Sequence, residues 1–186
     1  MDWLFRKISD VPEEDYLAIY DGLSASRKAH IDRLKKEADK KRSLLATGLI
    51  GKLLREKGIC ATLETGEDRR PYLGGCDLFV SITHSDQAVA CVVSEEPVGI
   101  DMERIKPVKA ALMTYICLPK EQAYVTQGAQ IGTVIEQEQM LLRFFEVWTA
   151  KEAAFKKQGA GQLLSIDTMT LEKTHYLKDG YLITIV

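Results

Sequence analysis

The sequence lacks long hydrophobic runs, closely spaced cysteines and any large excess of charge of one sign. Its 186 residues are 46% hydrophobic, which suffices for a real core in one domain or in two small halves. Apolar runs are only a handful of residues long, Ala88 to Val93 being typical, so we expect no membrane-spanning segment. The formal net charge of -2 gives no general attraction to nucleic acid or to an anionic membrane. We therefore expect neither as a partner.

The cysteines also exclude two classes of site. None forms a C-x-x-C pair, which argues against a zinc site and against a small disulfide framework. The N-terminal stretch MDWLFRKISD lacks the basic and apolar regions of a signal peptide. We therefore expect a cytoplasmic protein with reduced, mostly buried thiols, namely Cys60, Cys76, Cys91 and Cys117.

Helical signals divide the chain into two parts. Pro12 precedes an acidic helix that should end near Gly22, and Ser24 is placed to cap a second helix. Leucines at helical spacing between Ala38 and Lys57 predict a third helix with a buried stripe. Further helices are predicted from Pro119 and over about 134–157, the latter ended by Gly159 and Gly161.

Strand signals follow each helical group. Apolar segments predict strands at 59–64, 78–83, 88–93, 98–103, 168–173 and 181–186. The turn HSDQ joins the strands at 78–83 and 88–93. Asp179-Gly180 marks the turn before the last strand. Helices followed by strands, twice over, predict an α+β protein whose two halves, 1–97 and 98–186, meet near residue 98.

The stretch VGIDMERIKP places two carboxylates two residues apart. In a strand, Asp101 and Glu103 project from the same face, about 6 to 7 Å apart. They repel each other, so they are either hydrated or held by a cation such as Mg²⁺. The spacing alone leaves both interpretations open.

The stretch FFEVWTAKEAAFKKQGAG carries a third carboxylate. Helical spacing puts Trp148, Glu152 and Lys156 on one stripe. A solvated Glu–Lys pair is the ordinary interpretation, but a carboxylate beside an inward-facing Trp needs a partner. Asp101 and Glu103 together with Glu152 would give the all-oxygen site that Mg²⁺ prefers when it also binds phosphates.

Two loops carry groups that can bind an anion. In RRPYLGG, Pro71 holds Arg70 extended, which suits presentation of a guanidinium. In SITHS, Thr83 and His84 end a strand where hydroxyl, imidazole and backbone N–H groups are available. Taken alone, His84 is more often an ordinary turn residue, and Arg42 a solvated helix charge.

The order of these motifs carries a resemblance. RRPYL, ITHSDQAVA, PVGIDMERI and FFEVWTAKEAAFKKQGAG together resemble the 4'-phosphopantetheinyl transferases, specifically the pseudo-dimeric surfactin-synthetase-activating type. The likeness covers about residues 24–161. It implies two similar α/β halves with the active site at their interface, and a monomer. It also implies coenzyme A and an apo acyl or peptidyl carrier protein as substrates, with Mg²⁺ as cofactor.

The resemblance assigns roles to individual residues. Asp101, Glu103 and Glu152 would hold Mg²⁺ against the diphosphate of coenzyme A, so Asp101 also belongs to the coenzyme A site. Lys156 would contact a coenzyme A phosphate, and Glu152 would be the base for the carrier serine. The N-terminal half would bind the adenosine end of coenzyme A and its 3'-phosphate through Arg42, Arg70, Thr83 and His84.

Some positions match the family less closely. Arg27 and His30 align loosely with basic positions, and a histidine in place of a lysine would weaken phosphate binding at neutral pH. Lys151 is equally suited to a structural role. The reaction implied is transfer of 4'-phosphopantetheine to a carrier serine. Two alternatives remain, a non-catalytic member that binds coenzyme A or a carrier, and a Mg²⁺-dependent phosphohydrolase using the same carboxylates.

Overall fold

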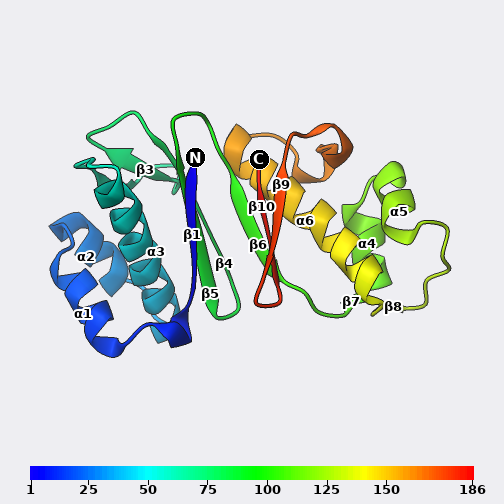
Figure 1. The fold of residues 1–186 in the computed structure, drawn as a ribbon, viewed down its shortest axis with the longest axis horizontal. Coiled ribbons are helices and arrows are strands. Elements are labelled where there is room, and N and C mark those ends of the chain that lie inside the picture. Colours follow the sequence, from blue (N-terminus) through cyan, green and yellow to red (C-terminus); the bar gives the residue numbers. More distant parts are fainter. The chain divides into compact units, whose positions relative to one another are not determined.

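The computed structural model describes residues 1–186, which form two compact units, Met1–Val98 and Gly99–Val186. Each unit has a three-stranded antiparallel sheet with one long helix packed against it (Figure 1). The α+β class predicted from the sequence is confirmed. No helix combines the length and the apolar character needed to cross a bilayer.

Unit 1 contains three helices, five strands and a short 3-10 turn. In chain order they are β1 Asp2–Lys7, η1 Ile8–Asp10, α1 Glu13–Asp21, α2 Ala25–Asp32, α3 Glu37–Glu56, β2 Thr62–Thr65, β3 Pro71–Gly74, β4 Phe79–Ser85 and β5 Ala88–Ser94.

The three helices of unit 1 form where the sequence predicts them. Pro12 is the N-cap of α1, and the Ser24 side chain accepts the Arg27 backbone N–H to cap α2. On α3, the leucine stripe that includes Leu45, Leu49 and Leu53 is buried, as predicted. Figure 1 shows α3 between the sheet and the α1–α2 pair, so this helix is buried on two sides.

The main sheet of unit 1 has the order β1-β5-β4. The central strand β5 is buried at every position except Ser94, because α3 packs against it. Val89, Cys91 and Val93 share one core with the α3 stripe. Full burial of such side chains contributes roughly 1.5–3 kcal/mol each. The core therefore fixes β4 relative to α3, and these two elements carry two of the candidate residues, His84 and Arg42.

Unit 2 contains three helices, five strands and two 3-10 turns. In chain order they are β6 Ile100–Arg104, β7 Val108–Lys109, α4 Ala110–Ile116, α5 Pro119–Thr126, β8 Val134–Ile135, α6 Glu138–Gln158, η2 Leu163–Ser165, η3 Thr168–Thr170, β9 Thr174–Lys178 and β10 Tyr181–Ile185.

The sheet of unit 2 has the order β6-β10-β9, and α6 packs across β6 and β10. The first half of α6 packs with α4 and α5 around a second core that includes Phe144, Phe145 and Val147 (Figure 1). Gly159, with a φ of 81°, ends α6 in the left-handed conformation. The helix therefore ends where its glycines predict.

Several predicted boundaries are wrong. The segment 168–173 is not a strand: Thr168–Thr170 forms a 3-10 turn, and the edge strand β9 begins at Thr174. Residues 134 and 135 form β8 rather than the start of α6, and β2 begins at Thr62 rather than at residue 59. His84 and Ser85 still belong to β4, so the turn before β5 is shorter than HSDQ.

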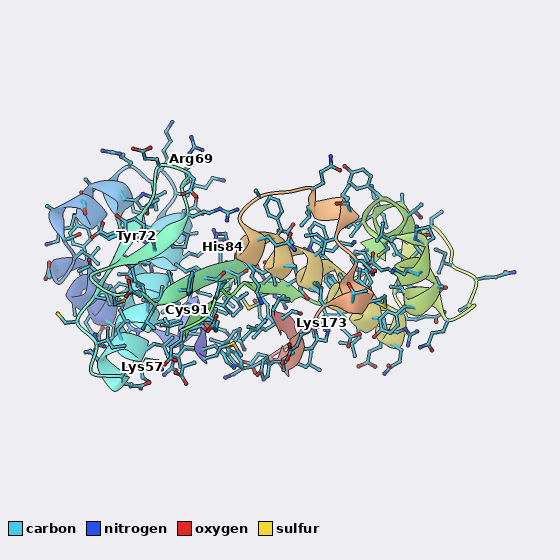
Figure 2. The ribbon with its side chains drawn as sticks, turned by 90° about the horizontal axis from the view of Figure 1, so that it is seen from above. Lys57, Arg69, Tyr72, His84, Cys91 and Lys173 are labelled. Carbon is cyan, nitrogen blue, oxygen red and sulfur yellow. The ribbon has the colours of Figure 1, made fainter.

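The sequence signals also missed elements and overstated thiol burial. No sequence signal predicts the strands β1, β3 and β7 or the helix α4. All four cysteines are free thiols, as expected, but only Cys91 and Cys117 are buried. Figure 2 shows Cys91 within the strands of unit 1. Burial raises the pKa of both buried thiols to about 12, which leaves them protonated and unreactive.

Candidate functional site

The two carboxylates of β6 project toward α6. Asp101 lies directly opposite Thr184 of β10, and Glu103 lies opposite Leu182. Residues opposite each other on antiparallel strands share a face, and Thr184 contacts Thr149 of α6 through hydroxyl oxygens 2.5 Å apart. Both carboxylates therefore occupy one face of β6, as the period of two predicts.

Asp101 is held by a lysine of α6. The Lys156 Nζ donates to Asp101 Oδ1 at 2.7 Å and to the Ile100 carbonyl oxygen at 3.1 Å. Only 9% of the Asp101 side chain is exposed, against 30% for Lys156. A charge-assisted hydrogen bond of this length is among the strong ones. The structure thus joins two of the predicted site residues directly.

Glu152 lies half-buried one turn before Lys156. Burial raises the pKa of its carboxyl above the ordinary value, and the charge of Asp101 raises it further. Lys156 lowers that pKa, and Glu103 raises it. The charges of Asp101, Glu103 and Lys156 thus all act on the Glu152 carboxyl. A carboxyl with a raised pKa is a better general base than an ordinary one.

The donor chemistry of this group suits a hard divalent cation, because all three candidate ligands are carboxylates. Nevertheless, no three side chains of the metal-binding kinds are arranged to hold an ion in this structure. The cation at Asp101 is the Lys156 ammonium. The carboxylates thus match Mg²⁺ in chemistry, but they are not grouped as a preformed site.

Lys151, whose role the sequence left open, is buried on another side of α6. Its ammonium forms an ion pair with Glu121 of α5 at 2.9 Å, and both side chains are fully buried. Lys151 also donates to the carbonyl oxygens of Leu164 and Ile166. Glu121 accepts from Thr168 and from the Leu118 backbone. This network is structural and ties α5 and the 163–168 segment to α6.

A second polar contact holds α6 on the sheet. The Thr184 hydroxyl lies between Thr149 of α6 and His175 Nδ1 of β9, 2.5 and 2.8 Å away. The Thr149 hydroxyl also donates to the Phe145 carbonyl oxygen. Burial lowers the pKa of His175. These contacts fix α6 over β10 near the carboxylate group.

Unit 1 contains a separate basic pocket of about 390 Å³. It lies among α2, α3, the β2–β3 hairpin and β4, and its cationic or titratable lining residues are Arg27, His30, Arg42, Arg69 and His84. Ser43 and Thr65 add hydroxyl groups, and Asp39 is the one carboxylate of the lining. An excess of positive charge with hydroxyl donors suits an anionic ligand.

This pocket includes two of the four predicted coenzyme A residues of the N-terminal half. Arg42 pairs with Asp39 at 2.6 Å and donates to the Asp86 carbonyl oxygen, which links α3 to the β4–β5 turn. His84 is exposed toward the pocket. Figure 2 labels His84 and Arg69 among the side chains of unit 1.

The other two predicted residues lie outside the pocket lining. Thr83 is buried on the face of β4 opposite to His84, because neighbouring strand residues alternate. Arg70 lies near Asp68, with Nε 3.7 Å from Oδ2. Arg69 lines the pocket instead, with a φ of 67°. The effect of Pro71 on its predecessor favours Arg70 in the sequence, whereas the pocket is lined by the adjacent Arg69.

Arg27 and His30 of α2, which align loosely with basic positions of the family, both line the pocket. Arg27 is buried and donates to the hydroxyls of Ser43, Thr47 and Thr65. Burial lowers the pKa of His30, and the positive charges of Arg27 and Arg33 lower it further. His30 is therefore neutral near pH 7.

Comparison with known proteins supports the motif assignment. The pattern of the 4'-phosphopantetheinyl transferase superfamily (ACPS) matches residues 97–179. The 4'-phosphopantetheinyl transferase gsp of Aneurinibacillus migulanus is 29% identical over 134 residues, which are 67% of this chain and 53% of that protein. The 4'-phosphopantetheinyl transferase Sfp of Bacillus subtilis (strain 168) is 22% identical over 176 residues, or 91% of this chain and 73% of that protein.

Residues 97–179 of the chain therefore belong to the 4'-phosphopantetheinyl transferase superfamily. The part of the chain that matches this transferase family contains the β6 carboxylates, the buried Lys151 and the Glu152–Lys156 stripe. A third relative, the 4'-phosphopantetheinyl transferase AcpT of Salmonella typhimurium, is 30% identical over 129 residues, which are 66% of this chain and 65% of that protein. The chain thus spans between about half and three quarters of these relatives' length.

Proposed function

We propose that this protein transfers the 4'-phosphopantetheine group of coenzyme A to a serine of an apo acyl or peptidyl carrier protein. Adenosine 3',5'-bisphosphate is the second product. The observation that carries the proposal is a group of charged residues within the part of the chain that matches the superfamily. Lys156 pairs with Asp101, and the charges of both residues and of Glu103 act on Glu152.

The protein groups have distinct roles in the proposed reaction. The serine oxygen forms a new bond to the phosphorus that carries the pantetheine, and the bond from that phosphorus to the bridging oxygen of the diphosphate breaks. Glu152 takes the serine proton, which its raised pKa favours. Lys156 offsets the negative charge that develops on the leaving phosphate. Positioning and charge neutralisation supply most of the rate in such a displacement.

Asp101, Glu103 and Glu152 are the proposed ligands of Mg²⁺. When bound, this ion would neutralise the diphosphate and orient its oxygens. The support is the chemistry of the donors and their position in the family motifs. Glu152 would then combine a ligand role with a base role.

The basic pocket of unit 1 is the proposed site for the adenosine end of coenzyme A. Its excess of cationic groups suits the 3'-phosphate, and Arg42 and His84 are the predicted residues that line it. We propose Arg69 in addition to Arg70, since Arg69 lines the pocket. Alignment with Sfp over 91% of the chain supports a two-half layout of the Sfp-like type.

The test is intact-mass spectrometry of an apo carrier protein incubated with this protein, coenzyme A and Mg²⁺. A mass gain of one phosphopantetheine group, absent with EDTA and with Glu152→Gln, is the expected result. Glu138→Gln, an exposed carboxylate in the first turn of the same helix, is the matched control and should retain the transfer.

Other results would favour the alternatives. Coenzyme A that binds without any carrier modification, across fatty-acid and secondary-metabolite carriers, would favour a non-catalytic binding protein. Coenzyme A cleaved by water in the absence of a carrier would favour a phosphohydrolase. Retention of full transfer by Glu152→Gln would remove Glu152 from the role of base.

A further inference from the structure

The Lys156 ammonium occupies the carboxylate that the proposed function assigns to a divalent cation. It donates to Asp101 Oδ1 at 2.7 Å and to the Ile100 carbonyl oxygen at 3.1 Å. These contacts connect the last turns of α6 to the first two residues of β6. Because the Asp101 side chain is only 9% exposed, a cation that reaches it must come close to this ammonium.

An ammonium and a divalent ion on one carboxylate are difficult to combine. Mg²⁺ requires oxygen ligands at about 2.0–2.1 Å in near-octahedral geometry. A positive charge within hydrogen-bonding distance of the same carboxylate repels the ion through the low-dielectric surroundings of a buried group. The lack of a preformed three-ligand group around Asp101, Glu103 and Glu152 agrees with this conflict.

We propose that Lys156 and the divalent cation compete for Asp101, so that metal binding releases Lys156 to a substrate phosphate. This inference rests on the proposed function, which supplies the metal and the diphosphate. The lysine is suited to such an exchange, because its ammonium ends a flexible four-carbon stem and 30% of its side chain is exposed.

The exchange has a thermodynamic consequence. A metal ion that must displace Lys156 binds more weakly than its ligands alone would allow, because only the released state is competent to bind it. A diphosphate that captures the released ammonium favours that same state. Metal and coenzyme A should therefore bind cooperatively, and the coupling must be equal in both directions.

The test is Mn²⁺ binding, measured by electron paramagnetic resonance of the free ion, with no coenzyme A present. Lys156→Met keeps the apolar length of the side chain and removes the ammonium. We expect it to bind Mn²⁺ about fivefold or more tightly than the unmodified protein, the lower end of ordinary coupling energies. Lys157→Met is the matched control, because it removes an exposed charge from the same helical turn. It should change the affinity less than twofold, since exposed charges are screened.

A second arm adds coenzyme A. In the unmodified protein coenzyme A should tighten Mn²⁺ binding, and Lys156→Met should lose most of that gain. Equal or weaker Mn²⁺ binding by Lys156→Met would overturn the exchange and leave the transferase proposal intact. Absence of Mn²⁺ binding by both proteins would overturn the exchange and the metal assignment together. A thermal melt verifies that each variant is folded, and Lys156→Gln replaces Lys156→Met if it is not.

Discussion

Gly99, the residue directly before β6, lies against the α6 backbone at Ala153. A Cβ atom added to Gly99 would lie 1.8 Å from the Ala153 carbonyl oxygen and 2.9 Å from the Lys157 backbone nitrogen. Gly99 also exchanges two backbone hydrogen bonds with Val186, so the strand cannot easily move away. This contact sets Asp101, two residues later, beneath the last turns of α6.

We therefore predict that Gly99→Ala separates β6 from α6. Overpacking of this kind costs about 1–3 kcal/mol, and more where backbone atoms are involved. Urea unfolding should show the loss of stability, and Mn²⁺ binding should weaken because Asp101 and Glu152 move apart. Gly132→Ala is the control, since an added Cβ there meets nothing within 4 Å. Unchanged unfolding of Gly99→Ala would show that the helix and the strand adjust freely.

The buried Lys151–Glu121 pair leads to a second prediction. Removing one partner of a buried ion pair leaves an uncompensated charge and costs about 3–5 kcal/mol. Lys151→Met should therefore destabilise the protein strongly in urea or thermal unfolding. Replacing both partners, with Glu121→Leu added, should cost less than the sum of the two single changes, because neither charge remains.

An exposed pair nearby provides the control for this prediction. Lys120 and Asp167 form an ion pair in which the Lys120 side chain is 54% exposed. Lys120→Met should cost much less than Lys151→Met, because solvent screens an exposed pair. Comparable losses of stability in Lys120→Met and Lys151→Met would mean that burial of the Lys151–Glu121 pair has no energetic importance.

Sequence reasoning succeeded where the backbone period or local capping decides the outcome. The common face of Asp101 and Glu103 follows from the period of a strand, and Ser24 and Gly159 mark helix ends by local hydrogen bonds and left-handed geometry. Asp179-Gly180 likewise forms the turn before β10. None of these requires knowledge of distant parts of the chain.

Failures arose where a distant group decides the local structure. Residues 168–173 have strand-like composition, but Glu121, 47 residues earlier, binds the Thr168 backbone and hydroxyl and holds a 3-10 turn. Ile59 cannot begin β2, because its backbone N–H caps α3 at the Leu54 carbonyl oxygen. The Lys156–Asp101 contact joins residues 55 apart in sequence and depends on the packing of α6 on β6.

A third prediction concerns the stability contributed by Glu152. Its folded-state pKa lies above the ordinary value of 4.5, chiefly because of burial and the charge of Asp101. The folded protein therefore binds the proton more tightly than the unfolded chain, so this group lowers stability as the pH rises through these two pKa values. In metal-free buffer, Glu152→Gln should melt at a higher temperature than the unmodified protein at pH 7.

That difference should shrink as the pH falls below 4.5, where the glutamate is protonated in both states. The same change should reduce carrier modification by about 10²–10⁴-fold if Glu152 is the base. Melting curves at several pH values separate the two effects. A lower melting temperature for Glu152→Gln at pH 7 would show that Lys156 stabilises the charged carboxylate more than burial and Asp101 destabilise it.

A fourth prediction uses His30 in the basic pocket. Burial and the charges of Arg27 and Arg33 keep its pKa below the ordinary value of 6.5, so the imidazole gains its charge only in mildly acidic solution. The ratio of adenosine 3',5'-bisphosphate affinities between the unmodified protein and His30→Asn should rise severalfold as the pH falls from about 7.5 to about 5.5. Calorimetric titration provides the affinities.

The ligand and His84 titrate in both proteins, so their protonation cancels in the ratio of the two affinities. Neutral adenosine is the control, since its affinity ratio should not depend on pH. A ratio that stays constant for the bisphosphate would place His30 out of contact with the bound phosphates.

The last prediction concerns α4, one face of which is buried and the other exposed. Met113 and Ile116 of α4 are buried, whereas Leu112 is 44% and Tyr115 71% exposed. Both exposed residues lie on α4 one helical turn apart. Exposed aromatic residues are frequent anchors of protein interfaces. Tyr115→Ser should therefore raise the KM for the carrier about tenfold, which corresponds to 1.4 kcal/mol.

Stability and coenzyme A affinity should stay unchanged in Tyr115→Ser, because an exposed side chain contributes little to the folded state. Leu177→Ser is the matched control, since Leu177 is 65% exposed on the edge strand β9 and should leave the KM for the carrier unaltered. Equal effects of the two changes would indicate general surface hydrophobicity, and an unaltered KM in Tyr115→Ser would exclude this part of α4 from carrier binding. A selective effect of Tyr115 would separate the two faces of α4 by role, with Met113 and Ile116 in the core and Tyr115 in recognition.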